Sequence, residues 1–474
     1  MAGRFLSLFK PLSRFMPEVS PPKRKVGFNE KIFWTLMALI LYLVMSQVPL
    51  YGVGLGGGME LTALRVIFAS NRGSLMELGI GPIVTAGLIL QLLVGSGMIE
   101  CDMSNPEDRA LFTSASKVFS FIFVGFQASA YIIGGVYGAL TFNTALIVFL
   151  QLLAAGLIVM MLDEMIQKGW GIGSGISLFI MAGVAQNILW DAFGLTPPVG
   201  DLKSYGFFIA LAQTLGRGEP LMSMVVRMNP ETGEALPYPT IPGFIATIAI
   251  FLIVIYMEGV RVELPLAYAG HRGFRSKYPI KLLYVSNLPV IFASALFANV
   301  YLFSQIFRNI AGRGFWVDLL GRFDPETGQP IGGLVYYVTA PRGITQVAAD
   351  PLRALGYASI MVVFCMIFSY TWLEVGNLSP STVAKQLVDS GMLIPGYRRS
   401  SKPIEAILKR YIPVVAVLGG IIVGLIAAVA DFVGVFGTGM GILLSIGILY
   451  QYYELLMRER VAEMYPAFRK VFGG

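Results

Sequence analysis

Long apolar segments, separated by shorter polar ones, run through most of the chain. A helix of about 20 residues crosses the ~30 Å hydrocarbon core of a membrane. Nine segments approach or exceed that length and one is shorter, and we expect ten spans at about 32–50, 83–94, 118–140, 143–162, 171–193, 241–260, 282–306, 355–375, 412–433 and 436–456. The pattern predicts an all-α polytopic membrane protein with ten transmembrane helices.

The second of these spans is too short to cross a membrane unaided, and a mixed segment precedes it. That segment carries Arg65, which a free span would not tolerate near the bilayer centre. Residues 79–82, Gly-Ile-Gly-Pro, then break the helix. Non-helical backbone at membrane depth survives only where protein or a water-filled cavity satisfies its polar groups. We therefore expect a re-entrant helix at about 60–70, beside a cavity.

Two five-span halves of opposite orientation are indicated by interruptions at matching positions. The fifth span opens with Gly171–Ile176 and the tenth with Gly437–Ile442, both of the form Gly-x-Gly-x-Gly-Ile. The second span is broken at Gly81-Pro82 and the seventh at 287–289, Asn-Leu-Pro. Such a pattern is typical of an inverted repeat with its functional path between the halves. The glycine runs continue into apolar helix with no strand before them, which argues against a nucleotide loop and is compatible with close helix packing.

The predicted spans divide the chain into successive regions. These are a cytoplasmic amphipathic and basic N-terminus (1–31), a first half with the re-entrant helix (32–193), an external segment (194–240), a second half (241–456) and a cytoplasmic tail (457–474). The second half contains basic cytoplasmic loops at 261–281 and 378–410 and a further external segment at 309–354.

The two external segments contain similar turns, Asn229–Gly233 and Asp324–Gly328. Proline after Asn or Asp opens a type I turn, and the glycine supplies a left-handed position. With the β-prone flanks Leu221–Arg227 and Leu334–Thr339, the pattern predicts a small β-hairpin in at least one segment, with an irregular loop as the alternative.

Composition supports the membrane interpretation and limits the chemistry. Hydrophobic residues make up 55% of the chain and charged residues 13%, against about 25% charged in soluble domains. Lys and Arg are concentrated in the N-terminus, the loops on its side of the membrane and the tail, which places both termini in the cytoplasm. The two cysteines are far apart and there is one histidine, so we expect no metal or other cofactor. Within the spans no His, Cys or carboxylate cluster suggests an enzyme.

The functional path is expected to be apolar. Acidic residues near the spans lie at or near helix ends, whereas the interrupted spans offer aliphatic side chains, namely Ile80, Val84, Ile176, Ile180, Ile291 and Leu444. A ring of such side chains would block ions by dewetting and could deform around a chain of any sequence. For each residue alone, core packing or lipid contact is the simpler interpretation.

Polar residues on the second and seventh spans suggest a weak seam between them. They are Thr85, Gln91, Ser286, Asn287 and Asn299. Hydrogen bonds between membrane helices contribute roughly 0.6 kcal/mol each, which suits a contact that must open, although ordinary interhelical bonding explains them equally well.

The basic loops carry two clusters of cations. One contains Arg272, Arg275, Lys277 and Lys281; the other contains Arg398, Arg399, Lys402, Lys409 and Arg410. These charges set orientation and contact anionic lipid, or they dock a polyanion such as ribosomal RNA.

Two functions fit these residues. One is a passive pore for unfolded polypeptides. The other is a secondary transporter, also an inverted-repeat class, whose substrate site could use carbonyls of the glycine runs.

Longer motifs resemble one family specifically. They are MPEV at 16–19, ASNRGSLMELGIGPIVTAGLILQLLVGSG at 69–97, NPEDRALF at 105–112, GIGSGISLFI at 171–180, YPIKLLYVSNLPVI at 278–291 and LKRYIP at 408–413. The chain resembles, over all ten spans, the SecY family of protein-conducting channels, the large (α) subunit of the Sec translocon, and most closely its archaeal members. The two external segments show no family motif.

The resemblance implies a role for each group of residues. The helix at 60–70, with Leu61, Leu64, Arg65, Ile67 and Phe68, would be the plug that closes the channel from outside. The six aliphatic residues above fall at pore-ring positions, and the second and seventh spans, with the third and eighth beside them, would form a lateral gate. Arg272, Arg398 and Arg399 match ribosome-contact positions, with Arg275 in the same loop.

The resemblance also implies partners and a location. These are a SecE (γ) subunit, a small β subunit, the ribosome with its nascent polypeptide and signal sequence, and the lipids of the cell membrane.

Overall fold

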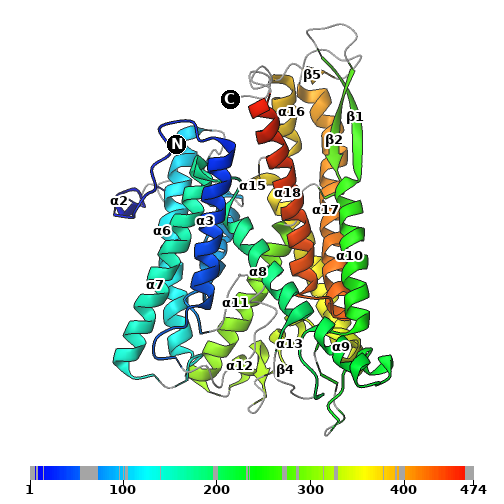
Figure 1. Cartoon of the computed structure of the whole chain (residues 1–474). Coiled ribbons are helices and arrows are strands. Elements are labelled where there is room, and N and C mark those ends of the chain that lie inside the picture. The colour runs from blue at the N-terminus through cyan, green and yellow to red at the C-terminus, as the bar shows by residue number, and fades with distance from the viewer. Residues whose placement is uncertain are drawn as a thin grey trace.

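A computed structural model of the chain shows a bundle of long, nearly parallel helices (Figure 1). It describes residues 6, 9–13, 15–53, 73–95, 97–99, 101, 105–138, 140–195, 201–230, 233, 235–236, 238–268, 275–283, 288–312, 314–324, 329–376, 378–389, 392–393 and 401–464.

Ten helices form the membrane-spanning body. They are α3 (Phe28–Gln47), α5 (Gly81–Gly95), α6 (Pro106–Ile133), α7 (Phe142–Met165), α8 (Gly175–Phe193), α10 (Ile241–Gly259), α11 (Leu288–Ala311), α15 (Pro351–Val375), α17 (Ser401–Val433) and α18 (Gly439–Met464). Within the described residues, nine are long and apolar enough to cross a membrane, and α5 is the short apolar exception. The ten-span, all-α prediction is confirmed. The seventh span begins later than predicted, because Leu282 and Leu283 precede α11.

The ten helices form two halves that run in opposite directions. The first half contains α3, α5, α6, α7 and α8, and the second contains α10, α11, α15, α17 and α18. In Figure 1, α3 leads away from the end of the molecule that carries strands β1 and β2, whereas α10 leads towards it. The halves meet at two seams, one where α5 and α6 pack against α11 and α15, and one where α8 and α3 pack against α18.

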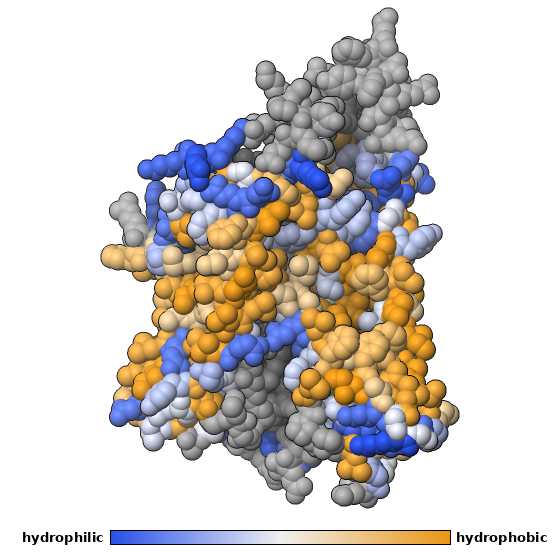
Figure 2. All heavy atoms as spheres, viewed as in Figure 1, coloured by the Kyte–Doolittle hydropathy of each residue, from blue (hydrophilic) through white to orange (hydrophobic). Residues whose placement is uncertain are grey.

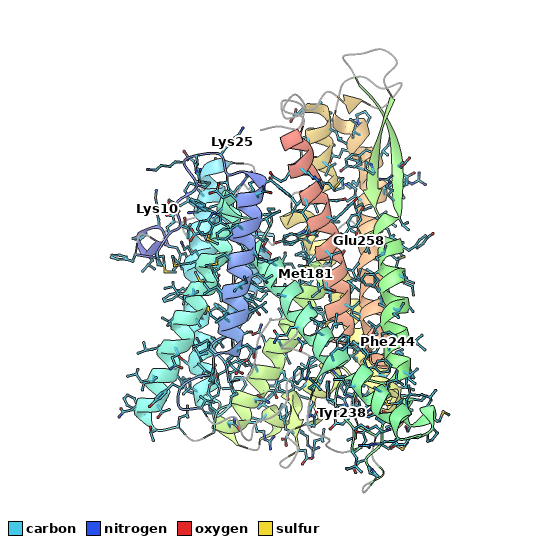
Figure 3. All side chains as sticks on the ribbon, viewed as in Figure 1. Lys10, Lys25, Met181, Tyr238, Phe244 and Glu258 are labelled. Atoms are coloured by element: carbon cyan, nitrogen blue, oxygen red, sulfur yellow. The ribbon has the colours of Figure 1, made fainter. Side chains whose placement is uncertain are left out.

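The outer surface has the polarity expected of a membrane protein. Figure 2 shows hydrophobic residues in a band around the middle of the visible face, with hydrophilic residues above and below it. Lys10 and Lys25 lie at one end of the molecule and Tyr238 at the other, while Met181 on α8 lies near mid-height (Figure 3).

The N-terminal segment packs partly against the first half. Leu6 is fully buried and Phe9, just before the short helix α2 (Lys10–Ser13), is almost fully buried, in a cluster with Ile99, Ala115 and Val118. Further along, Lys168 forms an ion pair with Glu18, and this ammonium group holds the pKa of the Glu18 carboxyl below its ordinary value. Some apolar side chains of this amphipathic segment therefore pack against the protein itself.

The two basic loops contain strands, which the sequence patterns did not predict. Strands β1 (Arg261–Tyr268) and β2 (Arg275–Lys281) form an antiparallel hairpin, with Arg261 opposite Lys281. Strand β5 (Met392–Leu393), from the second basic loop, pairs with the distal end of β1 through Ala267 and Tyr268. The two loops thus form one small sheet, next to α16 (Pro380–Asp389), at the end of the molecule from which α3 starts.

The second external segment contains a small hairpin, as predicted for at least one of the two segments. Strands β3 (Arg322–Phe323) and β4 (Pro330–Gly332) pair antiparallel, and most of the predicted turn between them, residues 325–328, lies outside the described residues. The predicted β-prone flanks are wrong. Leu221–Met224 forms the 3₁₀ helix η2 and Leu334–Val338 forms helix α13. Short helices α12 (Phe315–Leu320) and α14 (Gly343–Ala349) complete this segment.

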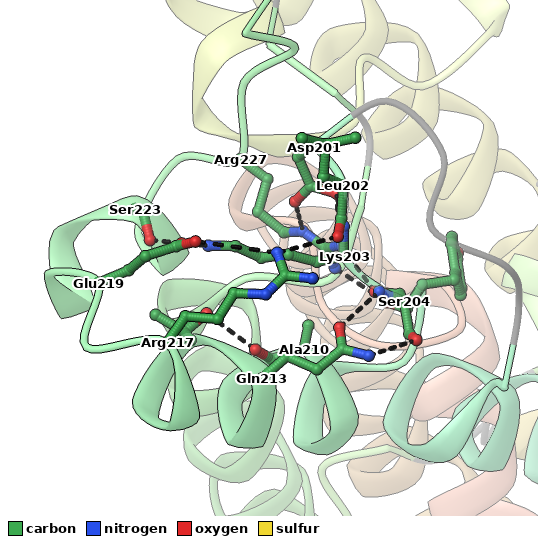
Figure 4. A network of polar contacts seen from close by, with 12 residues as sticks. Asp201, Leu202, Lys203, Ser204, Ala210, Gln213, Arg217, Glu219, Ser223 and Arg227 are labelled. Atoms are coloured by element: carbon green, nitrogen blue, oxygen red, sulfur yellow. Dashed lines mark hydrogen bonds and ion pairs between the residues drawn. The ribbon is translucent and has the colours of Figure 1, made fainter.

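The first external segment is organised around a buried arginine. Arg227 is 1% exposed and pairs with both carboxylate oxygens of Asp201 at 2.6 and 3.0 Å. Its Nη groups also donate to the backbone carbonyls of Ser204 and Tyr205, and Lys203 forms an ion pair with Glu219 at 2.6 Å (Figure 4). Because both cations are paired, burial does not leave an uncompensated charge.

This network secures helix α9 (Phe207–Gly216) at the end of α8. Phe207 packs on Phe244 of α10 at a ring distance of 5.0 Å and on Phe436 before α18 at 5.6 Å. The external segment therefore joins the first half to the second through a packed aromatic contact.

Candidate pore and lateral gate

The six aliphatic residues singled out in the sequence converge on one hydrophobic cluster between the halves. Four of them are buried, with exposed fractions of 0% for Ile80, 9% for Val84, 1% for Ile180 and 0% for Leu444. Ile176 and Ile291 are partly buried and pack against the same cluster. The cluster draws on α5, α8, α11 and α18, so residues from the two halves, separated by up to 364 positions between Ile80 and Leu444, meet in space.

Four of the six residues form two equivalent pairs in the inverted halves. Val84 lies two residues after Pro82 at the start of α5, and Ile291 lies two residues after Pro289 at the start of α11. Ile180 is the sixth residue of α8, and Leu444 is the sixth residue of α18. Each pair therefore occupies the same place on corresponding helices, as a constriction formed by the two halves requires.

The helix that carries Val84 begins at a defined point because the chain before it is pinned. The backbone N–H of Leu50 donates to the Gly73 carbonyl at 2.7 Å, and that of Leu75 donates to the Val48 carbonyl at 2.9 Å. The residues between these two bonds include the predicted plug. Ile80 follows the pinned turn, and Pro82, which needs no N–H partner, suits the first turn of α5.

Large side chains that the sequence analysis did not single out complete the cluster. Tyr42 of α3 stacks on Phe179 of α8 at a ring distance of 4.7 Å, and both are at most 1% exposed. Ile448 lies one turn beyond Leu444 in the same cluster. Apolar periodicity alone could not distinguish these residues from ordinary core positions.

The second seam, between α8 and α18, is held at both ends by polar contacts. The Tyr452 hydroxyl of α18 donates to the Ser174 carbonyl before α8 at 2.8 Å. The Asp191 carboxylate of α8 accepts from the Gly437 N–H before α18 at 2.6 Å. Each helix thus binds the turn that precedes the other.

The first seam contains the predicted polar residues that the structure describes. The Asn299 amide of α11 donates to the Thr85 hydroxyl of α5 at 3.2 Å and to the Ala295 carbonyl of its own helix at 2.8 Å. This is a single neutral hydrogen bond between two helices of opposite halves, in keeping with a seam that separates at low cost.

Gln91 lies further along the first seam, beside a narrow apolar crevice. The crevice is lined by Leu88, Gln91, Leu92, Phe292, Phe368, Thr371 and Trp372. Within the described part of the chain, the buried Oε1 of Gln91 has no hydrogen-bond partner. Helix α15 supplies three of the lining residues, so the seam involves the eighth span as well as the second and seventh.

Several predicted site residues lie outside the described residues. These are the plug residues Leu61, Leu64, Arg65, Ile67 and Phe68, the seam residues Ser286 and Asn287, and the loop residues Arg272, Arg398 and Arg399. Arg275 begins strand β2, and its side chain is outside the description.

The fold and these contacts define a class: a polytopic membrane protein of two inverted five-helix halves, which enclose an aliphatic cluster and meet along a weakly bonded seam. The sequence profile named SecY matches residues 74–453, and the profile named plug domain of Sec61p matches residues 40–73. The chain belongs to the SecY family.

Individual relatives agree over almost the whole chain. The protein translocase subunit SecY of Pyrococcus furiosus is 44% identical, with 98% of each chain covered. The protein transport protein Sec61 subunit alpha of Dictyostelium discoideum is 43% identical over 97% of this chain and 98% of the relative.

Solved structures show the same fold. A structure described as that of a protein conducting channel is 39% identical, with a TM-score of 0.82 over 97% of this chain and 98% of the other. Sec61 in a canine ribosome-channel complex from the endoplasmic reticulum is 38% identical, with a TM-score of 0.79 over the same shares. The family is one of translocation channels, so the function is one of transport rather than of catalysis.

Proposed function

We propose that unfolded polypeptides cross the membrane through the aliphatic cluster of Ile80, Val84, Ile176, Ile180, Ile291 and Leu444. The observation that supports this proposal most directly is the convergence of all six residues between the two inverted halves. In the resting state these side chains pack together and exclude water, which blocks ions. During transport the same side chains give way to a passing chain, and because they are apolar they contact any sequence without specific recognition.

Two further elements regulate this path. The segment at 60–70, within the region that matches the plug domain profile, closes the channel from outside. The seam between α5 and α11 is the lateral gate, which admits a signal sequence and releases transmembrane segments into lipid. Its cross-helix contact, Asn299 to Thr85, is weak enough to open when a signal sequence competes for the crevice near Gln91.

The sheet of β1, β2 and β5 is the docking surface for the ribosome. It joins the loops at 261–281 and 378–410, whose sequences include Arg272, Arg275, Arg398 and Arg399, and such a concentration of positive charge suits ribosomal RNA. A solved relative is Sec61 in a ribosome-channel complex. By the resemblance, a SecE (γ) subunit clamps the halves and a small β subunit lies at the periphery. The protein lies in the cell membrane with both termini in the cytoplasm.

Photocrosslinking tests the path. We expect a photoreactive residue at Ile80, and separately at Ile176, to form adducts with a stalled secretory chain translated on ribosomes bound to the reconstituted complex. The adducts should require a functional signal sequence, because only an opened channel admits the chain. The same group at Leu189, which lies on α8 and is 60% exposed, serves as the matched control. Absence of adducts at both ring positions, together with saturable uptake of a small solute into vesicles, would instead establish a secondary transporter.

Replacing Asn299 by leucine tests the gate. The substitution removes a bond worth roughly 0.6 kcal/mol. We therefore expect the ratio of closed to open gate at equilibrium to fall about threefold. Translocation of a substrate whose signal sequence has a shortened apolar core should rise by a similar factor, and a substrate with an intact signal should be unaffected. Thr85→Val should act in the same way. A fall in translocation of the weakened substrate in both variants would contradict the gate assignment.

A further inference from the structure

Two turns that precede α8 and α18 have the same construction. Gly173 has a φ of +78° and Gly437 a φ of +76°, a left-handed conformation that glycine adopts without strain. Helix α8 begins two residues after the first of these glycines, at Gly175, and α18 begins two residues after the second, at Gly439. The turns therefore correspond at Gly173 and Gly437, two residues away from the alignment that the glycine runs suggest.

A threonine from the first helix of each half holds the residue before each left-handed glycine. The Thr35 hydroxyl of α3 accepts from the Ile172 N–H at 3.0 Å and donates to the Lys31 carbonyl at 2.7 Å. The Thr247 hydroxyl of α10 accepts from the Phe436 N–H at 3.0 Å and donates to the carbonyl four residues earlier, at 2.7 Å. The same pair of bonds thus occurs in both halves.

A buried aspartate from the preceding helix holds the first turn of each of these helices. Asp163 of α7 is 9% exposed and accepts from the Ile176 N–H through Oδ1 at 3.0 Å. Asp431 of α17 is 3% exposed and accepts from the Gly439 N–H through Oδ1 at 2.7 Å. The second oxygens are also bonded, to the Gln167 amide at 2.8 Å and to the Tyr357 hydroxyl at 3.0 Å. Each carboxylate is therefore fixed in orientation before it meets the helix.

The start of each helix packs closely against the backbone of its anchor. A Cβ at Gly175 would lie 2.7 Å from the Asp163 Cα, and one at Gly439 would lie 2.8 Å from the Asp431 backbone nitrogen. Each helix start is pressed directly on the backbone that carries its aspartate. Ile180 and Leu444 follow five residues later on their helices, so the anchors determine the height and rotation at which both side chains enter the aliphatic cluster.

We propose that Asp163 and Asp431 are positioning residues of the pore seal, each holding one ring-bearing helix in register, with Thr35 and Thr247 as the second anchors. This inference rests on the proposed role of the aliphatic cluster as the pore. The aspartates do not themselves belong to the aliphatic cluster. They act through α8 and α18, and the seal between Ile180 and Leu444 depends on both.

The test measures resting ion leak and translocation separately, in the full chain reconstituted in vesicles with its partner subunits. Asp163→Leu and Asp431→Leu remove the acceptors, and each is expected to raise resting ion permeability by about tenfold, while translocation stays within about threefold of the unsubstituted channel. Asp163→Asn and Asp431→Asn retain an oxygen that accepts from the helix, so they should leave the leak near its starting level.

Two further sets of variants separate positioning from general destabilisation. Ser369 is 1% exposed and bonds the Ala416 carbonyl at 2.6 Å within the second half, so Ser369→Ala removes a buried bond between α15 and α17 that involves neither α8 nor α18 and should give no leak. If a leucine variant fails to assemble, Thr35→Val and Thr247→Val remove the second anchors with little change in shape and should raise the leak by about threefold.

The outcomes distinguish this inference from the pore assignment. Unchanged leak in the assembled leucine and valine variants, while Ile80 and Ile176 still crosslink to the nascent chain, overturns the positioning role alone. Leak that accompanies a proportional loss of translocation in every variant, including Ser369→Ala, also overturns it, because that pattern reports general destabilisation. Absence of the crosslinks in the unsubstituted protein overturns the pore itself.

Discussion

Replacing Ile180 and Leu444 together by serine is expected to raise the resting ion permeability of the closed channel by about 100-fold. These two side chains occupy equivalent places on α8 and α18 and are at most 1% exposed. Burial of one such aliphatic side chain is worth about 1.5–3 kcal/mol relative to water, and a hydroxyl offers water a hydrogen-bond partner. Removing two of them lowers the dewetting barrier to ion passage by about 3 kcal/mol, which corresponds to a rise of roughly 100-fold in ion permeability.

Ion conductance across planar bilayers containing the reconstituted complex measures this effect. The matched control is Leu189→Ser with Leu449→Ser, because these residues lie on the same two helices and are 60% and 56% exposed. The control pair should leave conductance unchanged. Equal leak from both pairs would show that any polar substitution on these helices disturbs the protein, and absence of leak from Ile180→Ser with Leu444→Ser would remove these residues from the seal.

Tying α5 to α11 is expected to stop translocation almost completely. In a background of Cys101→Ser and Cys365→Ala, the substitutions Thr85→Cys and Asn299→Cys place two thiols where the side chains now bond at 3.2 Å. A short bifunctional thiol reagent should join them and prevent the halves from separating at this seam. We expect signal-dependent translocation to fall by at least about tenfold, because a tie of covalent strength replaces a bond of roughly 0.6 kcal/mol.

The control tie joins two helices of the same half. Ser369→Cys on α15 and Ala416→Cys on α17 place thiols at another close, buried contact, where the Ser369 hydroxyl now bonds the Ala416 carbonyl. Crosslinking this pair should leave most of the activity, since the contact lies within one moving body. Full translocation through a channel crosslinked at Thr85 and Asn299 would place the opening elsewhere.

The order of apolar and polar residues along the chain is sufficient to predict the membrane class, the number of spans and the inverted repeat. Apolar runs of about 20 residues form membrane-spanning helices, because backbone polar groups in a membrane must be satisfied within the helix. The shortness of α5 and the breaks at Pro82 and Pro289 depend on residue type alone and are also visible without coordinates. The six aliphatic ring candidates stand out in the sequence by their place at the interrupted starts of four spans, and they meet in one cluster.

Other features depend on contacts between residues that are distant in the chain. The pairing of β1 with β5 joins loops more than a hundred residues apart. Apolar Val262, Leu264 and Leu266 do alternate along β1, but such a pattern does not identify the distant strand that pairs with it. Leu334–Val338 has β-branched and aromatic residues but forms a helix, because packing overrides weak strand propensity.

The anchoring of α8 and α18 shows most clearly which features the sequence predicts and which depend on the packed structure. Glycine runs before α8 and α18 are evident in the sequence, yet the register between them, Gly173 with Gly437, follows only from backbone angles and helix starts. Asp163 and Asp431 read as ordinary polar residues near helix ends. Their carboxylates acquire a role because each is buried against the start of another helix, where an N–H group without a partner would be costly. Hydropathy specifies which segments enter the membrane, whereas the place of each side chain within it depends on hydrogen bonds that form only after the helices have packed.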